Sequence, residues 1–599
     1  MIKQNLKLFF KTKRVSIPVV ILLLCCLGYH IYKLCYSFPL NGDVLVYLSS
    51  SLELCLLSFI ILYYASYEFF YLFRYSHIDE TLYSHKNGKF RTLISSITVF
   101  LFIPAIEFFI AFGFNIIIFI LSGMSDYSYL FHIFSVLFLY VFFGGIIPIL
   151  LGAIFAQKSK RIVSYASMAL IVFLISDVSK FIFGSLSDST KINFWEIKYF
   201  FAYILPNDLN WTVNYDYGMY AEIYRWNLTI FWIFLLLLLI FKLCYIKKTS
   251  LKVVTLLLTL LISTSNLIGY FYGGSHLEKG EGLDGNYMAD YLFYSKNEPK
   301  IQEPNFEVKS YNMDLNIWRE LKADISMTLS NKSLDYYNFT LYHGYKVSKI
   351  TDIDGNDLKY SRDGDYITVN GNGNLQTIKI KYSGYSPILY SNSQACSLLG
   401  FFPYYPVPGF YEIRNEYFTY KPLEIKSKAE FNIKVDSARQ IYSNLSEIDN
   451  RKNCFSGVTT SPTLISGFYK SNSSDNYEIY SETVNGYIAN KLDAQYIDKI
   501  QSYIDKLDKS ENKLQLEKYT IFGTDYTFPI YGVFLGDDTI LMKPGDAKEV
   551  AEKLLLQRDI GYCNYVEQEL TKDDQGNDDV TMAMLDMISA ALDMMDKYQ

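Results

Sequence analysis

Histidine is scarce in this chain of 599 residues: there are six, none follows His343, and no two lie four residues apart. The pair of imidazoles one helical turn apart that an HExxH metal site requires is therefore excluded. A phosphate loop of the form GxxxxGKS or GxxxxGKT is absent too, so the chain does not supply that cradle for nucleotide phosphates. Cysteine forms no CxxC motif, and only Cys396, Cys454 and Cys563 follow residue 272, which leaves room for one disulfide there.

Charged residues are few, at 19%, while half of the residues are apolar and 17% are aromatic, a composition that excludes a disordered chain. The charges are unevenly distributed. Residues 1–272 hold 21 Lys and Arg against 13 Asp and Glu, whereas residues 273–599 hold 34 against 48. A basic, apolar half is therefore followed by an acidic, more polar half.

Long apolar runs fill the first half. A run of about 20 apolar residues is long enough to cross a hydrocarbon core of roughly 30 Å as a helix. Seven such runs predict seven transmembrane helices: 15–36, 44–73, 93–121, 129–156, 162–184, 224–245 and 251–272.

Basic residues in the short loops predict the orientation of these spans. They gather before the first span and then at alternate ends, within residues 3–14, 74–91, 158–161 and 247–252. Because Lys and Arg are enriched in cytoplasmic loops, we expect a multi-pass protein of the plasma membrane with a cytoplasmic N-terminus and residues 273–599 outside. We expect a lipid membrane and no nucleic acid among its partners.

The residues before the first span have their own periodicity. Ile2, Leu6, Phe9 and Phe10 recur at helical spacing, with three lysines on another stripe. This pattern predicts a short amphipathic helix in the inner membrane interface. An unstructured basic leader is the alternative.

Two connections between the spans carry further information. Residues 74–91 form a short charged inner loop, and residues 194–206 with 219–226 form a long aromatic connection between the fifth and sixth spans. Together with the N-terminal helix and six of the spans, they resemble a type 2 ABC transporter permease, in which the first stretch forms a coupling helix and the second a half-inserted outer hairpin. The seventh span is an addition to that family's unit.

The resemblance implies partners. Residues that would dock in a groove of a separate cytosolic ABC ATPase are Ile78, Asp79, Glu80, Thr81 and Leu82. An ordinary charged loop is the alternative. The family's architecture also implies a homodimer, or a heterodimer with a second permease. This chain is expected to bind no cofactor, and ATP would act through the ATPase.

Ionisable residues within spans are costly to bury and are therefore candidate functional positions. Glu107 in the third span is the deepest, and Asp177 and Lys180 in the fifth are three residues apart, so they can pair on one helix face. A contact with a transported substrate and a carboxyl group facing the bundle interior without a role in transport both remain open.

After a linker, 273–305, the apolar residues alternate with polar ones in three runs: at Ile325, Met327 and Leu329, at Ile378, Ile380 and Tyr382, and at Phe431, Ile433 and Val435. Asp-Gly pairs at 354–355 and 363–364 lie between such runs, where type I′ turns occur. The fold class predicted for the whole chain is a membrane all-α bundle, 1–272, followed by an extracytoplasmic β-sandwich, 306–480, and a smaller α/β region, 481–599, with a C-terminal helix. His343 falls within a strand-like run and is expected on the strand surface.

Several runs of the outer half, within residues 327–333, 342–350, 382–385 and 399–406, resemble the N-terminal saddle domain of zinc aminopeptidases of the aminopeptidase N type. They are most similar to the subgroup fused behind ABC permease segments in low-GC Gram-positive bacteria. The resemblance covers 306–480 and implies a peptidase-like region.

That resemblance places the metal-binding helix at 548–552, where Lys548 and Glu552 replace the histidines. A Lys ammonium has no lone pair to donate, and a lone carboxylate suits harder cations than Zn²⁺. Glu549 is either a vestige of the general base or the N3 residue of a capping box that Asp546 opens, and we favour the cap. The region is therefore expected to be a pseudo-peptidase, with no metal and no catalytic residue.

Together these patterns predict the membrane subunit of an ATP-driven ABC transporter that exports a peptide, lipid or drug-like substrate. Its extracytoplasmic domain would be non-catalytic. The alternative is a membrane-anchored surface receptor or immunity protein whose outer sandwich binds a peptide or protein.

Cysteine labelling tests the predicted topology. On a cysteine-free background, Ser474→Cys should react with a membrane-impermeant thiol reagent in intact cells, whereas Lys86→Cys should not, because only the first is predicted to face out. Both should react once the cells are permeabilised. Labelling of Lys86→Cys in intact cells would reverse the orientation.

Overall fold

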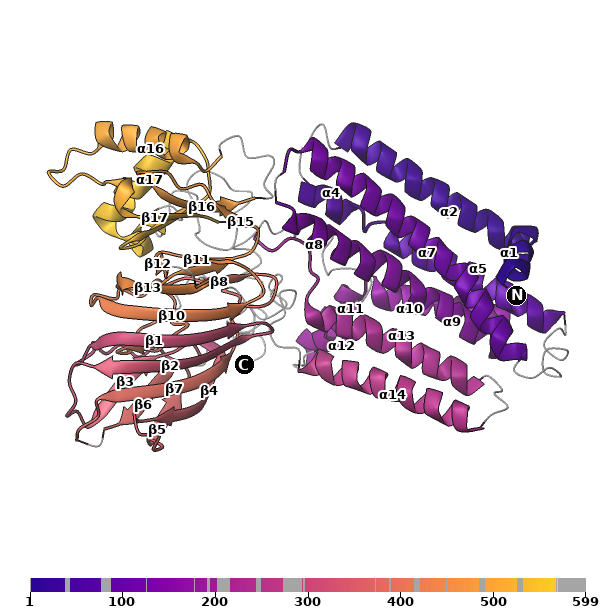
Figure 1. The fold of residues 1–599 in the computed structure, drawn as a ribbon, viewed down its shortest axis with the longest axis horizontal. Coiled ribbons are helices and arrows are strands. Elements are labelled where there is room, and N and C mark those ends of the chain that lie inside the picture. The colour runs from indigo at the N-terminus through magenta and orange to yellow at the C-terminus, as the bar shows by residue number, and fades with distance from the viewer. Residues whose placement is uncertain are drawn as a thin grey trace.

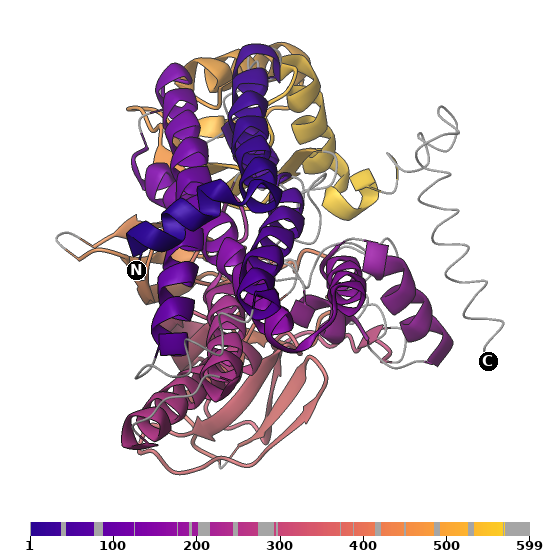
Figure 2. The same ribbon diagram turned by 90° about the vertical axis from the view of Figure 1, so that its right-hand side faces the viewer.

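The two halves of the sequence fold differently, and the sheets of the second half stack against one end of the helices of the first (Figure 1, Figure 2). We call residues 2–272 the helix bundle and residues 293–568 the sheet region. The computed structural model describes residues 2–37, 44–76, 88–124, 126–176, 178–190, 194–201, 216–243, 249–272, 293–294, 297–371, 373–386, 389–413, 421–448, 451–483, 491–524, 532–566 and 568.

Apolar helices joined by short connections form the helix bundle. Their bounds are α1 (Ile2–Lys11), α2 (Lys13–Tyr32), α4 (Val44–Ser50), α5 (Cys55–Tyr75), α7 (Gly88–Leu121), α8 (Ser128–Leu137), α9 (Gly144–Lys158), α10 (Arg161–Ile175), α11 (Val178–Thr190), α12 (Trp195–Phe201), α13 (Ile223–Leu243) and α14 (Thr249–Phe271), with π-helical turns η1 (Lys33–Ser37) and η2 (Phe138–Phe143).

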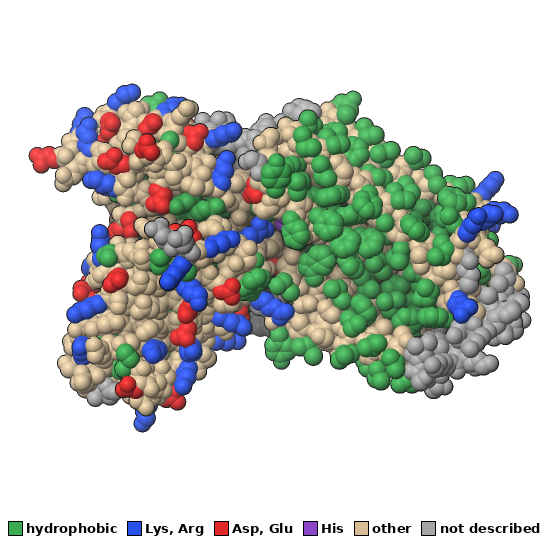
Figure 3. Space-filling model, viewed as in Figure 1, with side chains coloured by type: hydrophobic (Ala, Val, Ile, Leu, Met, Phe, Trp, Pro, Cys, Tyr) green, Lys and Arg blue, Asp and Glu red, His purple; other side chains and the backbone are tan. Residues whose placement is uncertain are grey.

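Six helical stretches in the described part are long and apolar enough to cross a membrane: Lys13–Tyr36, Val44–Tyr75, Phe90–Leu121, Ser128–Lys158, Ile223–Lys242 and Lys252–Phe271. They correspond to six of the seven predicted spans. Large apolar side chains such as Phe109, Phe131 and Ile162 are exposed on the bundle. On the face in Figure 3 apolar side chains cover the bundle, while charged ones gather on the sheet region and at the far end. A membrane protein is the class that this surface fits.

The predicted fifth span, 162–184, is interrupted. α10 ends at Ile175, and the backbone of Ser176 is extended, with φ −85° and ψ 163°. The Ser176 hydroxyl donates to the carbonyl of Phe173 at 2.9 Å, and the Ser179 hydroxyl donates to the carbonyl of Ser176 at 2.8 Å. Hydroxyls that bond to nearby carbonyls compete with the helix ladder. α10 and α11 are therefore two short helices where the sequence predicts one continuous span.

The amphipathic helix predicted at the N-terminus is present as α1. Its Phe9 ring is buried edge-on against Phe100 of α7, with the ring centroids 5.5 Å apart. The amide of Asn5 donates to the Ser95 hydroxyl, also on α7, at 2.7 Å. Phe10 remains exposed, as the predicted place in a lipid interface requires.

The sheet region contains four sheets in its described part. Their orders are β12-β13-β10-β1-β2-β7-β4, β5-β6-β3-β9, β11-β14-β8 and β15-β16-β17-β19-β18. The strands are β1 (Val308–Ile317), β2 (Leu321–Leu329), β3 (Tyr336–Thr340), β4 (Tyr345–Thr351), β5 (Tyr360–Asp363), β6 (Tyr366–Asn370), β7 (Thr377–Gly384), β8 (Cys396–Leu398), β9 (Val407–Pro408), β10 (Ala429–Ser437), β11 (Ile441–Ser443), β12 (Ser446–Glu447), β13 (Cys454–Thr459), β14 (Leu464–Ser466), β15 (Tyr469–Ser471), β16 (Glu478–Glu482), β17 (Thr520–Gly523), β18 (Val533–Leu535) and β19 (Thr539–Met542).

Alternating side chains build the core of this mostly β region. In β2, β7 and β10 the apolar side chains that the sequence places on one face are buried, as predicted. β2 pairs with β1 and β7 in antiparallel register, which places Ile325 between Met313 and Ile380. The seven-stranded and four-stranded sheets share one apolar core. At the predicted turn between β5 and β6, Gly364 has a φ of 58°, which favours glycine.

The last sheet is mixed and carries two helices, α16 (Ala494–Leu507) and α17 (Ala547–Ile560). β16, β17 and β19 are parallel, and the helices contribute Ile497 and Leu554 to a core that they share with Ile479 and Ile540. The sequence predicts an α/β region from residue 481, and this sheet already starts at Tyr469 with β15. The predicted C-terminal helix lies outside the described residues.

The position predicted for His343 is wrong. It lies in a turn between β3 and β4 and is largely buried. Its ring stacks on Phe293, with the ring centroids 3.7 Å apart, and its Nδ1 atom lies 3.1 Å from the carboxylate of Asp365. The strand pattern misleads here because Gly344 breaks the run and lets the chain turn.

Candidate functional site

A polar cluster lies inside the helix bundle. The carboxyl group of Glu107 on α7 is buried and accepts a hydrogen bond from the Ser58 hydroxyl of α5 at 2.8 Å. The His30 ring on α2 is also buried, its Nδ1 atom lies 3.1 Å from the Tyr47 hydroxyl, and its Nε2 atom has no partner in the described part of the chain. Glu107, Ser58 and His30 line a cavity of about 20 Å³, which is large enough for one water molecule.

Of the residues predicted for transport or coupling, Glu107 therefore lies in the bundle interior, with Cys26 and Cys55 on the same cavity. Asp177 lies outside the described residues, and so does the Lys180 side chain. The predicted coupling segment, Ile78 to Leu82, lies outside them as well.

A second polar site joins the bundle to the sheet region, and we call it the junction. At its centre is Asp216, in the segment before α13. Its buried carboxylate accepts hydrogen bonds from the hydroxyls of Tyr390 and Tyr469, both at 2.6 Å. Its backbone carbonyl accepts a third from the Phe468 N–H at 2.7 Å. One residue of the bundle is thus held by two separate segments of the sheet region.

The close approach at the junction depends on Gly467. Its φ is 150°, and a Cβ atom there would lie 2.0 Å from the Asp216 carbonyl oxygen. The next residue, Phe468, is fully buried among bundle side chains, with its ring 5.4 Å from the Tyr129 ring and 5.1 Å from the His132 ring, both on α8. The sheet region therefore inserts an aromatic anchor into the bundle.

Gln394 adds a set of backbone contacts at the junction. Its side-chain amide donates to the carbonyls of Tyr217 and Met219 at 3.2 and 3.0 Å, and its carbonyl accepts from the Ala221 N–H at 2.9 Å. These bonds fix the path of the segment that leads into α13.

Burial raises the pKa of Asp216 above its usual range, although the hydrogen bonds from Tyr390 and Tyr469 oppose that rise. The guanidinium of Arg439, from the sheet region, lies 4.8 Å from the centre of the Phe468 ring, and burial lowers its pKa. The carboxylate of Asp126, between α7 and α8, accepts from the Thr483 hydroxyl at 3.0 Å. Charged groups from both regions therefore meet at the junction.

The degenerate metal positions lie on α17 and face solvent. Lys548, Glu549 and Glu552 are exposed, and Lys548 lies 3.5 Å from Glu552 across one helical turn. Asp546 caps the helix, because its carboxylate accepts from the N–H groups of Lys548 and Glu549 at 3.0 and 3.1 Å. The predicted cap is therefore confirmed. The Glu549 carboxylate pairs with Lys553 at 2.6 Å and does not bond back to the N–H of Asp546, as it would in a complete capping box. Among the described residues no group of three or more His, Cys, Asp and Glu could hold a metal ion.

Sequence reasoning missed the junction. Asp216 stands out only as one of several acidic residues in a loop, and Tyr390, Gln394 and Tyr469 carry no motif. The one usable signal is the aromatic, weakly charged run 215–220, in which three of six residues are tyrosine.

No protein-family model matches the chain, and no curated protein does. Solved structures that match part of the chain include an M1 zinc metallopeptidase from Deinococcus radiodurans (12% identity over 43% of this chain and 64% of that chain, TM-score 0.30) and native leukotriene A4 hydrolase from Saccharomyces cerevisiae (14% identity over 42% of this chain and 43% of that chain, TM-score 0.27). This chain spans less than two thirds of either protein. One of these neighbours is a peptidase by name and the other a hydrolase, and neither likeness is high enough to show a family or an activity.

Removing the tyrosine hydroxyls should loosen the junction. Tyr390→Phe and Tyr469→Phe each leave an Asp216 oxygen without that donor, a loss of about 1–3 kcal/mol for a buried group, and the double variant should lose more than either. Hydrogen–deuterium exchange at residues 216–221 and 464–469 should rise. Because burial raises the pKa of Asp216, the effect should be smaller in acid, where the carboxyl is protonated, than in alkaline buffer.

Tyr480→Phe is the matched control, because that hydroxyl donates to the exposed carboxylate of Glu478 at 2.7 Å. It should leave exchange at the junction unchanged. Equal exchange in the control and in the double variant would contradict the role given to Asp216.

Proposed function

We propose that this chain is the membrane subunit of an ATP-driven ABC transporter that exports a peptide, lipid or drug-like substrate. In this proposal the sheet region is a non-catalytic extracytoplasmic domain, and the N-terminus lies in the cytoplasm. The observation that carries the proposal is the junction, where bundle and sheet region bury polar and aromatic groups against each other.

An outer domain that is only anchored needs one span and a flexible linker. Here six membrane-length helices accompany the domain, and its contacts reach α8 and the start of α13. A buried contact of this kind transmits displacement, since pulling it apart would expose unpaired groups. Movement of those helices would therefore move the sheet region. A transporter can use such coupling, whereas a receptor whose helices only anchor it has no need of it.

The polar cluster around Glu107 supports the same proposal. Ionisable groups at membrane depth are rare and often mark pathways for ions or substrates. The alternative is a carboxyl group that is simply hydrogen-bonded to Ser58 and takes no part in transport. Glu107 is therefore the intramembrane residue that we propose as a candidate for such a pathway.

The energy source in this proposal is a partner, since the sequence has no phosphate loop. A separate cytosolic ABC ATPase would dock at Ile78 to Leu82, and the transporter would be a homodimer or a heterodimer with a second permease. The chain itself would bind no cofactor and carry out no hydrolysis.

A surface receptor or immunity protein is the second candidate. In that case the helices only anchor the domain, and the sheet region binds a peptide or protein. A groove of about 790 Å³ in the sheet region is the observation that favours it.

Copurification tests the transporter proposal. The full-length chain, solubilised in mild detergent from its native membrane, should bring a separate Walker-type ATPase with it. Ile78→Asp with Leu82→Asp should abolish that association, because two charges would be placed in an apolar groove of the partner.

Thr249→Asp with Ser250→Asp is the control, since it adds the same charges on the same predicted side at the first residues of α14, where a helix tolerates them. The ATPase should remain bound to this variant. Absence of any ATPase would favour the receptor, and unchanged copurification of the first variant would remove Ile78 and Leu82 from the interface.

A further inference from the structure

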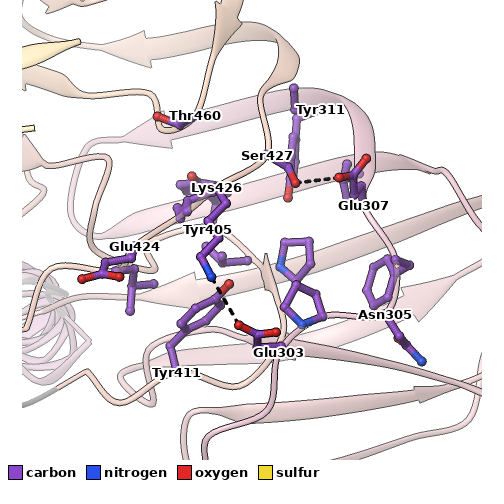
Figure 4. A pocket seen from close by; sticks show the side chains of 18 of the residues that line it. Glu303, Asn305, Glu307, Tyr311, Tyr405, Tyr411, Glu424, Lys426, Ser427 and Thr460 are labelled. Atoms are coloured by element: carbon purple, nitrogen blue, oxygen red, sulfur yellow. Dashed lines mark hydrogen bonds and ion pairs between the residues drawn. The ribbon is translucent and has the colours of Figure 1, made fainter. Parts of the chain in front are cut away.

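The sheet region has a groove (Figure 4), and none of the residues that line it belongs to the junction or to α17. Its volume, about 790 Å³, falls in the range of roughly 300–1,000 Å³ that is usual for ligand sites. Its walls come mainly from three segments that are distant in the sequence, 301–311, 405–412 and 421–431.

Aromatic side chains form the floor of the groove. The rings of Tyr311 and Phe431 are stacked in parallel, with centroids 4.7 Å apart, and the ring of Tyr405 stands edge-on to Tyr311 at 5.5 Å. All three are buried. A floor of this kind gives the groove a rigid apolar base on which an apolar side chain of a guest can rest.

Two buried hydroxyls in the lining have no hydrogen-bond partner in the described part of the chain. They are the hydroxyls of Tyr405, which is 1% exposed, and of Thr460, which is 7% exposed. A hydroxyl both donates and accepts, and leaving one buried and unpaired is unfavourable. Both hydroxyl oxygens are covered by neighbouring atoms, so each would gain a partner only if a guest with amide N–H and C=O groups displaced those atoms.

The rim of the groove has an excess of negative charge. Four carboxylates line it against two lysines: Glu303, Glu307, Glu412 and Glu424 against Lys421 and Lys426. Lys421 lies 2.8 Å from Glu412, and Lys426 lies 3.2 Å from Glu303. Glu307 accepts from the Ser427 hydroxyl at 2.8 Å, and neither it nor Glu424 has an ion pair among the described residues.

The Lys426 ammonium occupies the position beside Glu303 that a positively charged ligand would take. Figure 4 shows its side chain reaching from the 421–431 segment to Glu303 on the facing segment. The side chains of Lys426 and Glu303 are 76% and 86% exposed, and such exposed pairs contribute little to stability. A ligand with its own positive charge can therefore replace Lys426 at low cost.

We propose that this groove binds a short peptide that carries several positive charges and aromatic or aliphatic side chains, and that the peptide displaces Lys426 from Glu303. Because carboxylates lie on both walls, a ligand with more than one positive charge can pair with them. An apolar side chain between those charges would pack on the aromatic floor, and the peptide backbone would lie on the side of the two unpaired hydroxyls. The binding site does not depend on the ATPase partnership proposed above, so the two stand or fall separately.

A binding titration tests the assignment. The full-length chain in lipid nanodiscs is titrated with a fluorescent hexapeptide in which arginine and phenylalanine alternate. Glu307→Gln and Glu424→Gln should each weaken binding about two- to fivefold, the strength of an exposed ion pair. Lys426→Ala should tighten binding by a similar factor, because it removes the internal competitor, and Thr460→Val should weaken it.

The controls match the changes in charge. Asp324→Asn and Lys381→Ala alter an exposed pair on β2 and β7, 2.6 Å apart and outside the groove, and should leave binding unchanged. The proposal is overturned if the peptide does not bind, if a peptide with glutamate in place of arginine binds equally well, or if Lys426→Ala and Glu307→Gln shift the affinity in the same direction. Equal affinity for tetraphenylphosphonium, a single apolar cation that displaces the peptide, would assign the groove to small cations and overturn the peptide.

Discussion

Burial of the Asp216 carboxyl group is the constraint on which the arrangement of the two regions depends. A carboxylate removed from water is unfavourable by several kcal/mol unless hydrogen bonds replace its hydration. Tyr390 and Tyr469 supply those bonds from two different segments of the sheet region, so both segments must reach the same place. Gly467 permits the approach, and Phe468 fills the space beside it. A weak tether would require none of these features.

The surfaces of the two regions differ in composition. The bundle exposes Phe109 and Phe131 and buries Glu107, whereas the sheet region buries most of its aromatic residues and exposes most of its charges. At the junction the two patterns meet, since a buried phenylalanine lies beside a buried carboxylate and a guanidinium. That mixture gives the contact both affinity and a defined register, because the apolar part is non-directional and the hydrogen bonds are not.

Local periodicity made much of the fold predictable. The spacing of nearby residues was enough to predict six membrane-length apolar helices, the N-terminal helix, the alternation in β2, β7 and β10 and the Asp546 cap. The fifth span was less predictable, because the Ser176 and Ser179 hydroxyls bond to carbonyls that an apolar count ignores. His343 was also misplaced, because the strand-like sequence pattern continues through residues that form the turn between β3 and β4.

The junction and the groove were not predictable from spacing. Each is assembled from residues far apart in the chain, such as Asp216 with Tyr469 or Glu303 with Lys426, and no local pattern encodes such pairs. Glu107 was found because burial of a carboxyl group inside an apolar run is itself a local anomaly. A site that forms only when common residues from distant segments come together has no such local sequence signal.

The contacts at the junction require that the sheet region and the bundle move as one body. Spin labels at Tyr127→Cys, near the junction end of α8, and at Ser474→Cys, beyond β15, report the distance across the junction by pulsed electron resonance. A rigid junction should give one narrow distance distribution, unchanged when ATP and the copurifying ATPase are added. A broad distribution, or one that shifts with ATP, would contradict it and would make the sheet region a tethered domain.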